Sequence, residues 1–380
     1  MSGALLQPAA EALVRSSSDG PAMPPAAVLA VAEGDDVHVA AAGTADLLRG
    51  EAASVAHAQD LASVSKVLTT LAVQALASRG QLTMEATLGE VLGDRAGAHR
   101  DASVDDLLRH RSGMRPWWPL YLEPAAAEDP VGAALSLSPI APRGTERRYS
   151  DLGMQALGAV VERVAAMPLA RAVGELVLAP LAASSITAGA PAAGAPTLTG
   201  PDGDAIERTM VRTGVPYPVD VDDAAFDWRA GPVRRSIADG NAFHAFRGAA
   251  GHAGWFGDVE GLLRVAAALA DPAAAGIDPQ HARGLRVALD PGQGQGVRLF
   301  RVSWRGRERT VLGHPGFTGA FVGAAPASAG EPALRIALLS NRLHGRPAPT
   351  SDRLVDVERL WRTALGEADT ILHPTTGGRP

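Results

Sequence analysis

Lys66 is the only lysine of the chain, and the other 34 of its 35 basic residues are arginine. It lies in the stretch DLASVSKVLTT, residues 60–70, three positions after Ser63. A helix beginning here would place both side chains on one face. A desolvated lysine can release its proton, which arginine cannot, and could help to activate a serine hydroxyl at the helix N-terminus. An N-cap serine followed by a solvated lysine is the alternative interpretation of the same pair.

Two further clusters favour the catalytic interpretation. RRYSDLG, residues 147–153, contains Tyr149, one of only three tyrosines, directly before a strongly amphipathic stretch. A phenol can transfer a proton when a nearby ammonium lowers its pKa. LGHPGFTGAFV, residues 312–322, is rich in glycine at the end of an expected strand, where backbone N–H groups can bind a developing oxyanion. Each cluster by itself also fits ordinary packing.

The elements that must position these residues follow from hydrophobic periodicity. Helical spacing predicts a first helix over about 5–14 and another over 63–78 that ends before Gly80, while 84–183 is mostly helical in pattern. Residues 103 and 258 are expected N-caps, and a last helix is expected to be capped by Thr350 or Ser351. Hairpins are expected around 34–36 and 305–307, with an apolar strand over 333–341. Residues 184–204, rich in Ala, Pro and Gly, are expected to form an irregular loop.

This order of elements predicts an α+β fold in which both ends of the chain build one antiparallel sheet flanked by helices. We expect residues 1–83 and 240–380 to form the sheet domain. Residues 84–239 would form an inserted, mostly helical domain that contains the loop at about 184–204.

Composition limits the function. Hydrophobic residues make up 46% of the chain and charged residues 20%, as in globular domains. A net charge of −6 and the lack of a basic run argue against a nucleic-acid partner. There is no cysteine, no signal-peptide pattern and no run of eighteen apolar residues, so we expect a cytoplasmic protein without a membrane span. No histidine pair has metal-ligand spacing and the GQGQG at 292–296 lacks a strand-to-helix context, so we expect no metal and no cofactor.

Taken together, the clusters resemble the serine β-lactamase and penicillin-binding-protein-like superfamily, especially its esterase-like members with a class C type arrangement. Residues 63–66 match the Ser-x-x-Lys motif, 149–151 stand where the family has Tyr-x-Asn, and 314–316 stand at its Lys-Thr-Gly position. SVDDLLRHRSGM, PWWPLY, AGHAGWF and LLSNRLHGR are secondary matches. The resemblance covers about residues 25–365.

The resemblance implies that Ser63 is the acylated nucleophile and that Lys66 and Tyr149 move its proton. It also implies an oxyanion hole made of the backbone N–H groups of Ser63 and Phe317. Asp151 departs from the family's asparagine, and beside Lys66 its carboxylate would favour the charged ammonium, which would leave Tyr149 as the base. His314 departs from the usual cation, so recognition of a substrate carboxylate would be weakened unless an arginine supplies it.

The remaining candidate substrate-binding residues are those that could line the cleft: Gly316, Trp117, Trp118, Tyr121, His252, Arg342 and Arg346. The aromatic residues could equally form a core cluster, and His252 could be structural. We expect a serine hydrolase acting on a small ester or amide. A β-lactamase or D-alanyl carboxypeptidase, and a non-catalytic ligand-binding relative, are the alternatives. Neither the natural substrate nor the oligomeric state follows from the sequence.

Overall fold

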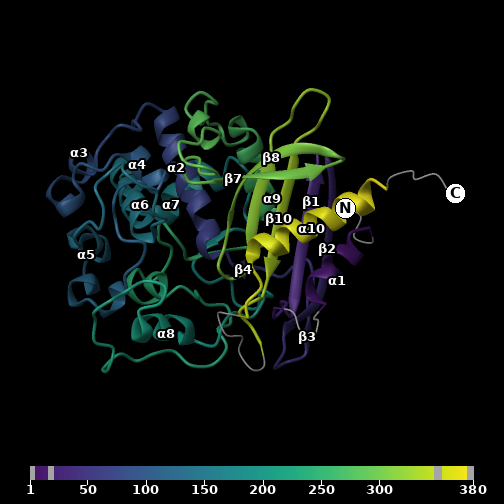
Figure 1. Cartoon of the computed structure of the whole chain (residues 1–380), viewed down its shortest axis with the longest axis horizontal. Helices are drawn as coiled ribbons and strands as arrows, with labels where there is room; N and C mark the ends of the chain where they lie inside the picture. The colour runs from purple at the N-terminus through teal and green to yellow at the C-terminus, as the bar shows by residue number, and fades with distance from the viewer. Residues whose placement is uncertain (1–4, 16–20, 346–352, 375–380) are drawn as a thin grey trace.

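A seven-stranded antiparallel sheet lies at the centre of the computed structural model, which describes residues 5–15, 21–345 and 353–374. Its strand order is β3-β2-β1-β10-β9-β8-β7 (Figure 1). The strands are β1 (Ala26–Glu33), β2 (Asp36–Asp46), β3 (Glu51–Ala52), β7 (Arg298–Trp304), β8 (Arg307–Pro315), β9 (Phe321–Ala325) and β10 (Leu334–Ser340).

Strand β1 joins the two ends of the chain. Its sequence AAVLAVAE is buried at every position but the last, as expected of a strand covered on both faces. It pairs with β2 on one side and with β10 on the other, where Leu29 stands opposite Leu338. The predicted α+β class and the antiparallel sheet built from both termini are therefore confirmed.

Helices cover both faces of this sheet. Helices α1 (Gln7–Val14) and α10 (Val357–Leu372) pack on one face, and α9 (Val259–Ala270) packs on the other, against β9 and β10 (Figure 1). The expected cap of α9 is confirmed, because the Asp258 side chain accepts a hydrogen bond from the Gly261 N–H. The expected cap of α10 is wrong: Asp356 caps it, whereas Thr350 and Ser351 lie outside the described residues. Asp356 stands immediately before the apolar stripe of this helix, which is the position that a cap requires.

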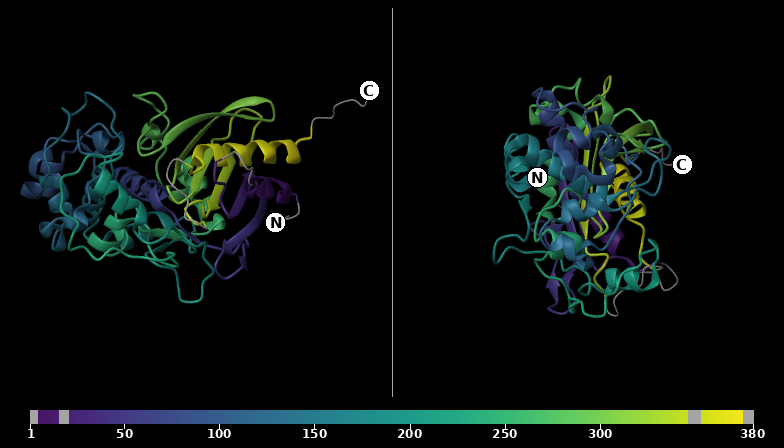
Figure 2. Two further views of the ribbon diagram at one scale, coloured as in Figure 1. Left: turned by 60° about the horizontal axis from the view of Figure 1, so that its bottom comes forward. Right: turned by 90° about the vertical axis from the view of Figure 1, so that its left-hand side faces the viewer.

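A mostly helical region lies beside the sheet (Figure 2). The helix α2 (Ser65–Ser78) leads from the sheet into it. Its other elements are α3 (Leu88–Leu92), α4 (Val104–Leu108), α5 (Pro130–Ser136), α6 (Asp151–Ala165), α7 (Leu169–Val173), α8 (Ala205–Thr213) and short 3-10 or π turns at Ala62–Val64, Gly93–His99, Leu120–Leu122, Pro124–Ala127, Gly174–Leu178, Asn241–Ala245, Pro272–Ala275 and Arg283–Leu285. The expected N-cap at Ser103 is confirmed as a capping box with Asp106. The domain boundaries at 83 and 240 stay a prediction.

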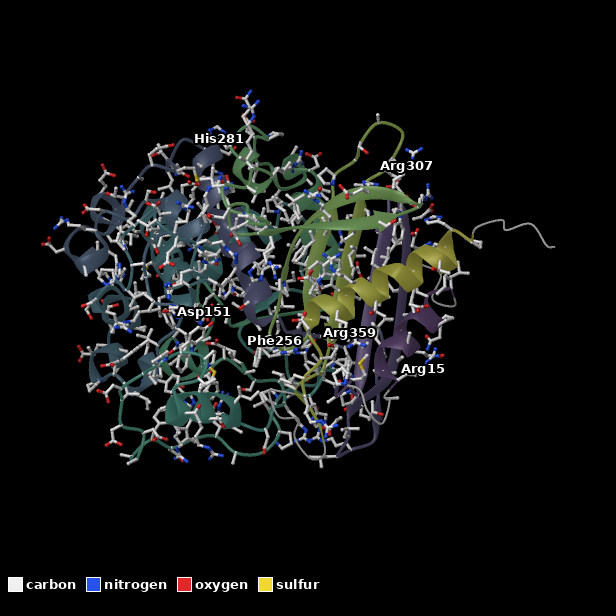
Figure 3. All side chains as sticks on the ribbon, in the orientation of Figure 1. Arg15, Asp151, Phe256, His281, Arg307 and Arg359 are labelled. Carbon is white, nitrogen blue, oxygen red and sulfur yellow. The ribbon has the colours of Figure 1, made fainter. Side chains whose placement is uncertain are left out.

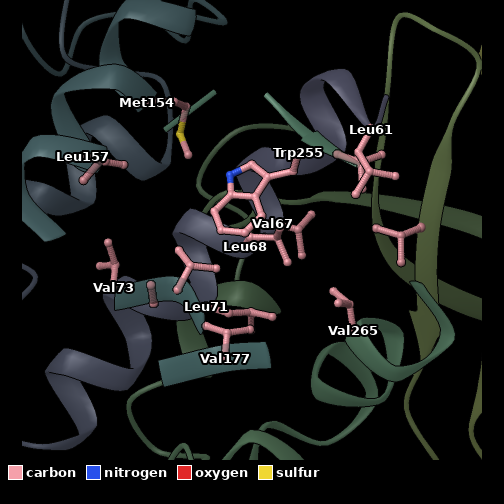
Figure 4. Packing of buried hydrophobic residues seen from close by; sticks show 14 of the residues in the cluster. Leu61, Val67, Leu68, Leu71, Val73, Met154, Leu157, Val177, Trp255 and Val265 are labelled. Atoms are coloured by element: carbon pink, nitrogen blue, oxygen red, sulfur yellow. The ribbon is translucent and has the colours of Figure 1, made fainter. Parts of the chain in front are cut away.

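The two regions share one apolar core around α2. Thirteen of the fourteen α2 residues are buried. Figure 4 shows Trp255 above the α2 residues Val67 and Leu68, with Met154 of α6 at the upper left of its ring. Gly251 allows its loop, residues 249–254, to approach α6, because a Cβ on Gly251 would lie 1.9 Å from the Met154 carbonyl oxygen. The loop 249–254 is thereby held between α2 and α6.

Three local features refine the predicted elements. The loop 184–204 contains a two-residue strand, β5 (Thr187–Ala188), which joins β4 (Gln59–Asp60) and β6 (Trp255–Gly257) in a second sheet. Two residues are too few for a periodic signal. Pro315 is the last residue of β8, so the missing N–H interrupts no strand. Arg305 and Gly306 form the predicted tight turn with φ of 53° and 71°.

Among the described helices, none combines the length and the apolar character needed to cross a membrane.

Candidate active site

Ser63 lies in a tight 3-10 turn, Ala62–Val64, that opens directly into α2. Ala62 has a φ of 44°, a left-handed conformation that disfavours side chains other than glycine. The turn is held from both sides: the Asp60 carboxylate accepts the Ala62 N–H at 2.8 Å, and the Leu61 N–H donates to the Trp255 carbonyl at 2.8 Å. Such local strain is typical of functional positions that the surrounding structure over-determines.

The Lys66 ammonium uses its three N–H donors on three different elements. Nζ donates to Ser63 Oγ at 2.7 Å and to the His252 carbonyl oxygen at 3.2 Å, and it lies 2.7 Å from Asp151 Oδ1. The Lys66 side chain has no exposed surface. Burial by itself would lower the pKa of Lys66, but the Asp151 carboxylate, followed by Tyr149, raises it above its ordinary value. Lys66 is therefore a fixed cation at neutral pH.

Tyr149 reaches the same serine from the start of α6. Its Oη donates to Ser63 Oγ at 3.0 Å, and the Lys66 Nζ lies 5.0 Å from the centre of its ring. Ser150 caps α6, because its Oγ accepts the Gly153 N–H, and this fixes the residue before it. Burial raises the pKa of Tyr149, and the Lys66 ammonium opposes that shift. The resting phenol is therefore protonated, and Lys66 makes its deprotonated form easier to reach.

Two neutral histidines flank the Tyr149 ring. His110 packs at 4.7 Å between ring centres and His314 at 5.9 Å. Burial and the nearby Lys66 charge hold the pKa of His110 well below its usual range and lower that of His314 to about 3. His314 is therefore uncharged where the family's motif carries a cation.

The two expected oxyanion donors come from neighbouring segments. The loop after β8 is tied to the residues before Ser63: Thr318 Oγ1 donates to the Asp60 carbonyl at 2.8 Å, and Gln59 Nε2 donates to the Thr318 carbonyl at 3.1 Å. Gly316 passes so close to this segment that a Cβ would lie 2.5 Å from the Leu61 carbonyl oxygen. Within the described part of the chain, the amide N–H groups of Ser63 and Phe317 donate to no protein acceptor.

Arg342 supports this loop. Its Nε donates to the Phe317 carbonyl at 2.9 Å, its Nη1 donates to the Val355 carbonyl, and its guanidinium lies 5.2 Å from the Phe317 ring centre. Burial lowers the pKa of Arg342 to about 10, so the group still carries its charge at neutral pH. Two of its three nitrogens are thus bound to backbone carbonyls. Arg346 lies outside the described residues.

The expected aromatic wall divides into two groups. Trp117 is buried. It lies beside the site, because the carbonyl of the preceding residue, Pro116, accepts the Asp151 N–H at 2.8 Å. The Tyr217 ring stacks on the Trp117 ring, with 6.3 Å between their centres. Trp118 points to Glu123 instead, to which its Nε1 donates at 2.7 Å.

Tyr121 belongs to a separate aromatic cluster. Its Oη donates to Glu207 at 2.7 Å, and its ring contacts Phe226, Trp228 and His244. Trp118 and Tyr121 thus contact different residues from those that Trp117 contacts, so the three do not form one aromatic wall.

His252 contributes its backbone to the site and its ring to a buried polar network. Its carbonyl accepts from Lys66, while Nε2 bonds the Asp239 carboxylate at 3.0 Å. Asp239 precedes Gly240, whose N–H donates to Glu207 at 2.6 Å. This network connects the loop beside Lys66 to α8.

Sequence reasoning missed His110, Tyr217 and Asp239 as neighbours of the site. His110 lies within a stretch that matched the family, and Tyr217 is one of three tyrosines, so residue rarity was the available signal. No group of three His, Asp or Glu side chains within the described ranges is arranged to hold a metal ion.

Chemically, the geometry offers a serine oxygen with two polar partners, a fixed cation, and two free backbone donors nearby. These are the components of nucleophilic acyl transfer.

Comparisons with known proteins identify relatives of the chain. The chain matches the sequence model described as Beta-lactamase over residues 12–359. It is 34% identical over 148 residues to Esterase EstB of Burkholderia gladioli, a match that covers 32% of this chain and 36% of that esterase. The chain thus matches about a third of the length of that curated relative.

Solved structures share the fold at low identity. EstCE1, a hydrolase with promiscuous acyltransferase activity, has a TM-score of 0.67 at 20% identity over 97% of each chain. The D-amino acid amidase of Ochrobactrum anthropi SV3 has a TM-score of 0.68 at 16% identity, covering 96% of this chain and 98% of that one.

Proposed function

The chain belongs to the beta-lactamase family, and we propose that it is a serine hydrolase that cleaves a small ester through an acyl-enzyme on Ser63. One observation carries the proposal. Ser63 Oγ lies within hydrogen-bond distance of both Lys66 Nζ, at 2.7 Å, and Tyr149 Oη, at 3.0 Å. A capping serine needs neither partner.

In the proposed acylation, Tyr149 is the base. Tyr149 first releases its phenolic proton to solvent, a step that the Lys66 ammonium beside it favours. The phenolate then takes the Ser63 proton while Oγ attacks the carbonyl carbon. The negative charge on the carbonyl oxygen would be held by the N–H groups of Ser63 and Phe317. Tyr149 then gives its proton to the leaving alkoxide as the ester bond breaks.

Deacylation repeats these steps with water. Tyr149 accepts a proton from the water that attacks the acyl carbon, and returns a proton to Ser63 Oγ as the acid leaves. Lys66 keeps its charge throughout, because Asp151 holds its pKa above the ordinary value. In this mechanism Lys66 acts by electrostatics and Tyr149 by proton transfer.

Ester cleavage is preferred over β-lactam or D-alanyl peptide cleavage because of the charges in the site. His314 is neutral, and two nitrogens of Arg342 are bound to the Phe317 and Val355 carbonyls. Neither offers the free cation that a substrate carboxylate would need. The partial match to Esterase EstB supports the same choice.

Burst kinetics with p-nitrophenyl acetate and butyrate test the proposal. We expect a burst of p-nitrophenol equivalent to the enzyme concentration, followed by slower turnover, and neither in Ser63→Ala. Turnover that survives in Ser63→Ala would refute the nucleophile. Nitrocefin cleavage faster than ester cleavage would favour the β-lactamase alternative, and acylation without turnover would favour a ligand-binding relative.

A further inference from the structure

Asp151 carries a carboxylate oxygen that the protein leaves unused. Its Oδ1 is fully buried, 2.7 Å from Lys66 Nζ. The side chain as a whole is nevertheless 18% exposed, whereas Lys66 is not exposed at all. Because Oδ1 is buried, the exposed surface of Asp151 lies on other atoms of its side chain. Within the described residues, Oδ1 makes the ion pair with Lys66 and no other hydrogen bond, and none of the side-chain hydrogen bonds involves Oδ2.

The Asp151 carboxylate lies close to the nucleophile. Asp151 and Ser63 are both in contact with the single Lys66 ammonium, so their side chains are two hydrogen-bond lengths apart through Nζ. Figure 3 shows Asp151 well inside the outline of the molecule, unlike His281 and Arg307 at its edge. Its side chain is partly exposed, and it contacts the fully buried Lys66.

An aromatic pair stands beside the same carboxylate. The Asp151 N–H donates to the carbonyl of Pro116, the residue before Trp117, and Tyr217 stacks on Trp117. Burial raises the pKa of Tyr217, and the Asp151 carboxylate raises it further, as expected if the two groups face each other. The site thus combines a carboxylate acceptor with an apolar aromatic wall.

The charges around Ser63 favour a cationic group in this position. Lys66 and Asp151 neutralise each other, His314 is uncharged, and the Asp239 carboxylate lies behind the loop that contacts Lys66. A substrate carboxylate would meet Asp151 without a free cation to bind it. An ammonium could instead donate directly to Oδ2, and charge-assisted hydrogen bonds are the stronger kind.

We propose that Asp151 selects esters whose acyl group carries a free ammonium next to the scissile carbonyl, that is, α-amino esters. This inference rests on the proposed function and adds a substrate class to it. The ammonium would bind Oδ2 while the side chain of the amino acid packs against Trp117 and Tyr217.

Three methyl esters of one carbon skeleton test the inference. Wild-type kcat/KM is measured for phenylalanine methyl ester (both enantiomers), N-acetylphenylalanine methyl ester and 3-phenylpropionic acid methyl ester. We expect at least one free-amine enantiomer to exceed both amine-free esters by about tenfold or more. The preference should decline as the pH rises past about 8, where an α-amino group loses its proton. Equal rates for the three esters, or faster cleavage of the N-acetyl ester, would overturn the inference.

Two variants locate the carboxylate. Asp151→Asn should reduce the ratio between amine and amine-free esters to near one, whatever its effect on the overall rate. Asp239→Asn, the same substitution at the other carboxylate near Lys66, should preserve that ratio. If the ratio collapses only in Asp239→Asn, Asp151 is not the selecting residue. Absence of cleavage of every ester, with no Ser63 adduct, would instead refute the proposed function.

Discussion

Among the single residues, Lys66 occupies a position that an arginine would not fit. Lys66 has no exposed surface and divides its three donors among Ser63, Asp151 and the His252 carbonyl. A guanidinium is planar and larger, and it cannot point three donors from one atom. The exception among 35 basic residues is therefore explained by geometry and volume.

Lys66→Arg tests this requirement. We expect kcat/KM for p-nitrophenyl butyrate to fall by at least about 100-fold, because the larger arginine would displace Ser63 from Tyr149 and so disrupt the proton transfer between them. The melting temperature should also fall, because a larger side chain overfills a closed site. Arg79→Lys, at the exposed end of the same helix, is the control and should keep both values. Wild-type turnover in Lys66→Arg would show that no special need for lysine exists.

Site residues of rare types could be predicted from the sequence. Contacts between residues that are far apart in the sequence could not. Ser63, Lys66 and Tyr149 form one cluster, as their types and order suggested. Tyr217 lies 100 positions after its stacking partner Trp117, so no local pattern connects the two. The hydrogen bonds from Arg342 to the Phe317 and Val355 carbonyls are likewise tertiary contacts, which no local sequence pattern predicts.

At the scale of elements, glycine allows the loop after β8 to approach the turn that carries Ser63. The Gly316 N–H donates to the Ala320 carbonyl at 2.7 Å, while its Cα faces the Leu61 carbonyl oxygen. Sequence periodicity predicted both segments but not their contact. For α10, a stretch that contains Thr, Ser and two Asp residues offered several equivalent caps, and only the packing of the helix selects Asp356.

Gly316→Ala tests the fit of this loop. The added Cβ would lie 2.5 Å from the Leu61 carbonyl oxygen, so the loop must move away from Ser63. We expect kcat for p-nitrophenyl butyrate to fall at least about tenfold, because the Phe317 N–H, the proposed oxyanion donor, would be displaced and would stabilise the transition state less well.

Gly366→Ala is the matched control for that substitution. Gly366 is exposed within α10 and a Cβ there meets no atom within 4 Å. It should keep full activity and gain up to about 1 kcal/mol of stability. Normal activity in Gly316→Ala would show that catalysis does not depend on the position of the loop after β8.

The docking of α8 is expected to depend on pH through Glu207. Its carboxyl group accepts the Tyr121 hydroxyl and the Gly240 N–H, and burial, followed by the Asp239 charge, raises its pKa from 4.5 to about 8. The folded protein therefore keeps a proton that the unfolded chain releases above about pH 4.5. This group lowers the free energy of unfolding as the pH rises from about 4.5 to 8.

Glu207→Gln should remove that loss, because an amide has no proton to release. We expect the variant to match wild type near pH 5 and to exceed it by about 1–3 kcal/mol at pH 8. Urea unfolding at both pH values measures the difference. A difference that does not change between pH 5 and pH 8 would show that Glu207 is ionised in the folded protein.

At the scale of the whole molecule, the site depends on a sheet closed by both ends of the chain. β1 and β10 pair along their length although more than 300 residues separate them, as the pair Ala27 and Ser340 illustrates. The antiparallel sheet was predictable because its long strands alternate or are continuously apolar. The three-stranded sheet of β4, β5 and β6 was not, since its strands have only two or three residues.

Hydrogen exchange should reflect this closure. We expect the amides of β1 and β10 to exchange slowest and at similar rates, because opening either strand exposes both apolar layers of the core. The edge strand β7 should exchange earlier. Fast exchange of β1 while β10 stays protected would contradict a jointly formed sheet.

Mass spectrometry can locate the acyl group of the proposed acyl-enzyme on a single residue. The full-length protein is mixed with p-nitrophenyl butyrate, quenched in acid within the burst phase, digested and analysed by mass spectrometry. We predict that the butyryl group, about 70 Da, is found on Ser63 in wild type and on no residue in Ser63→Ala. A butyryl group on any other residue during turnover, or turnover without any adduct on Ser63, would contradict the account.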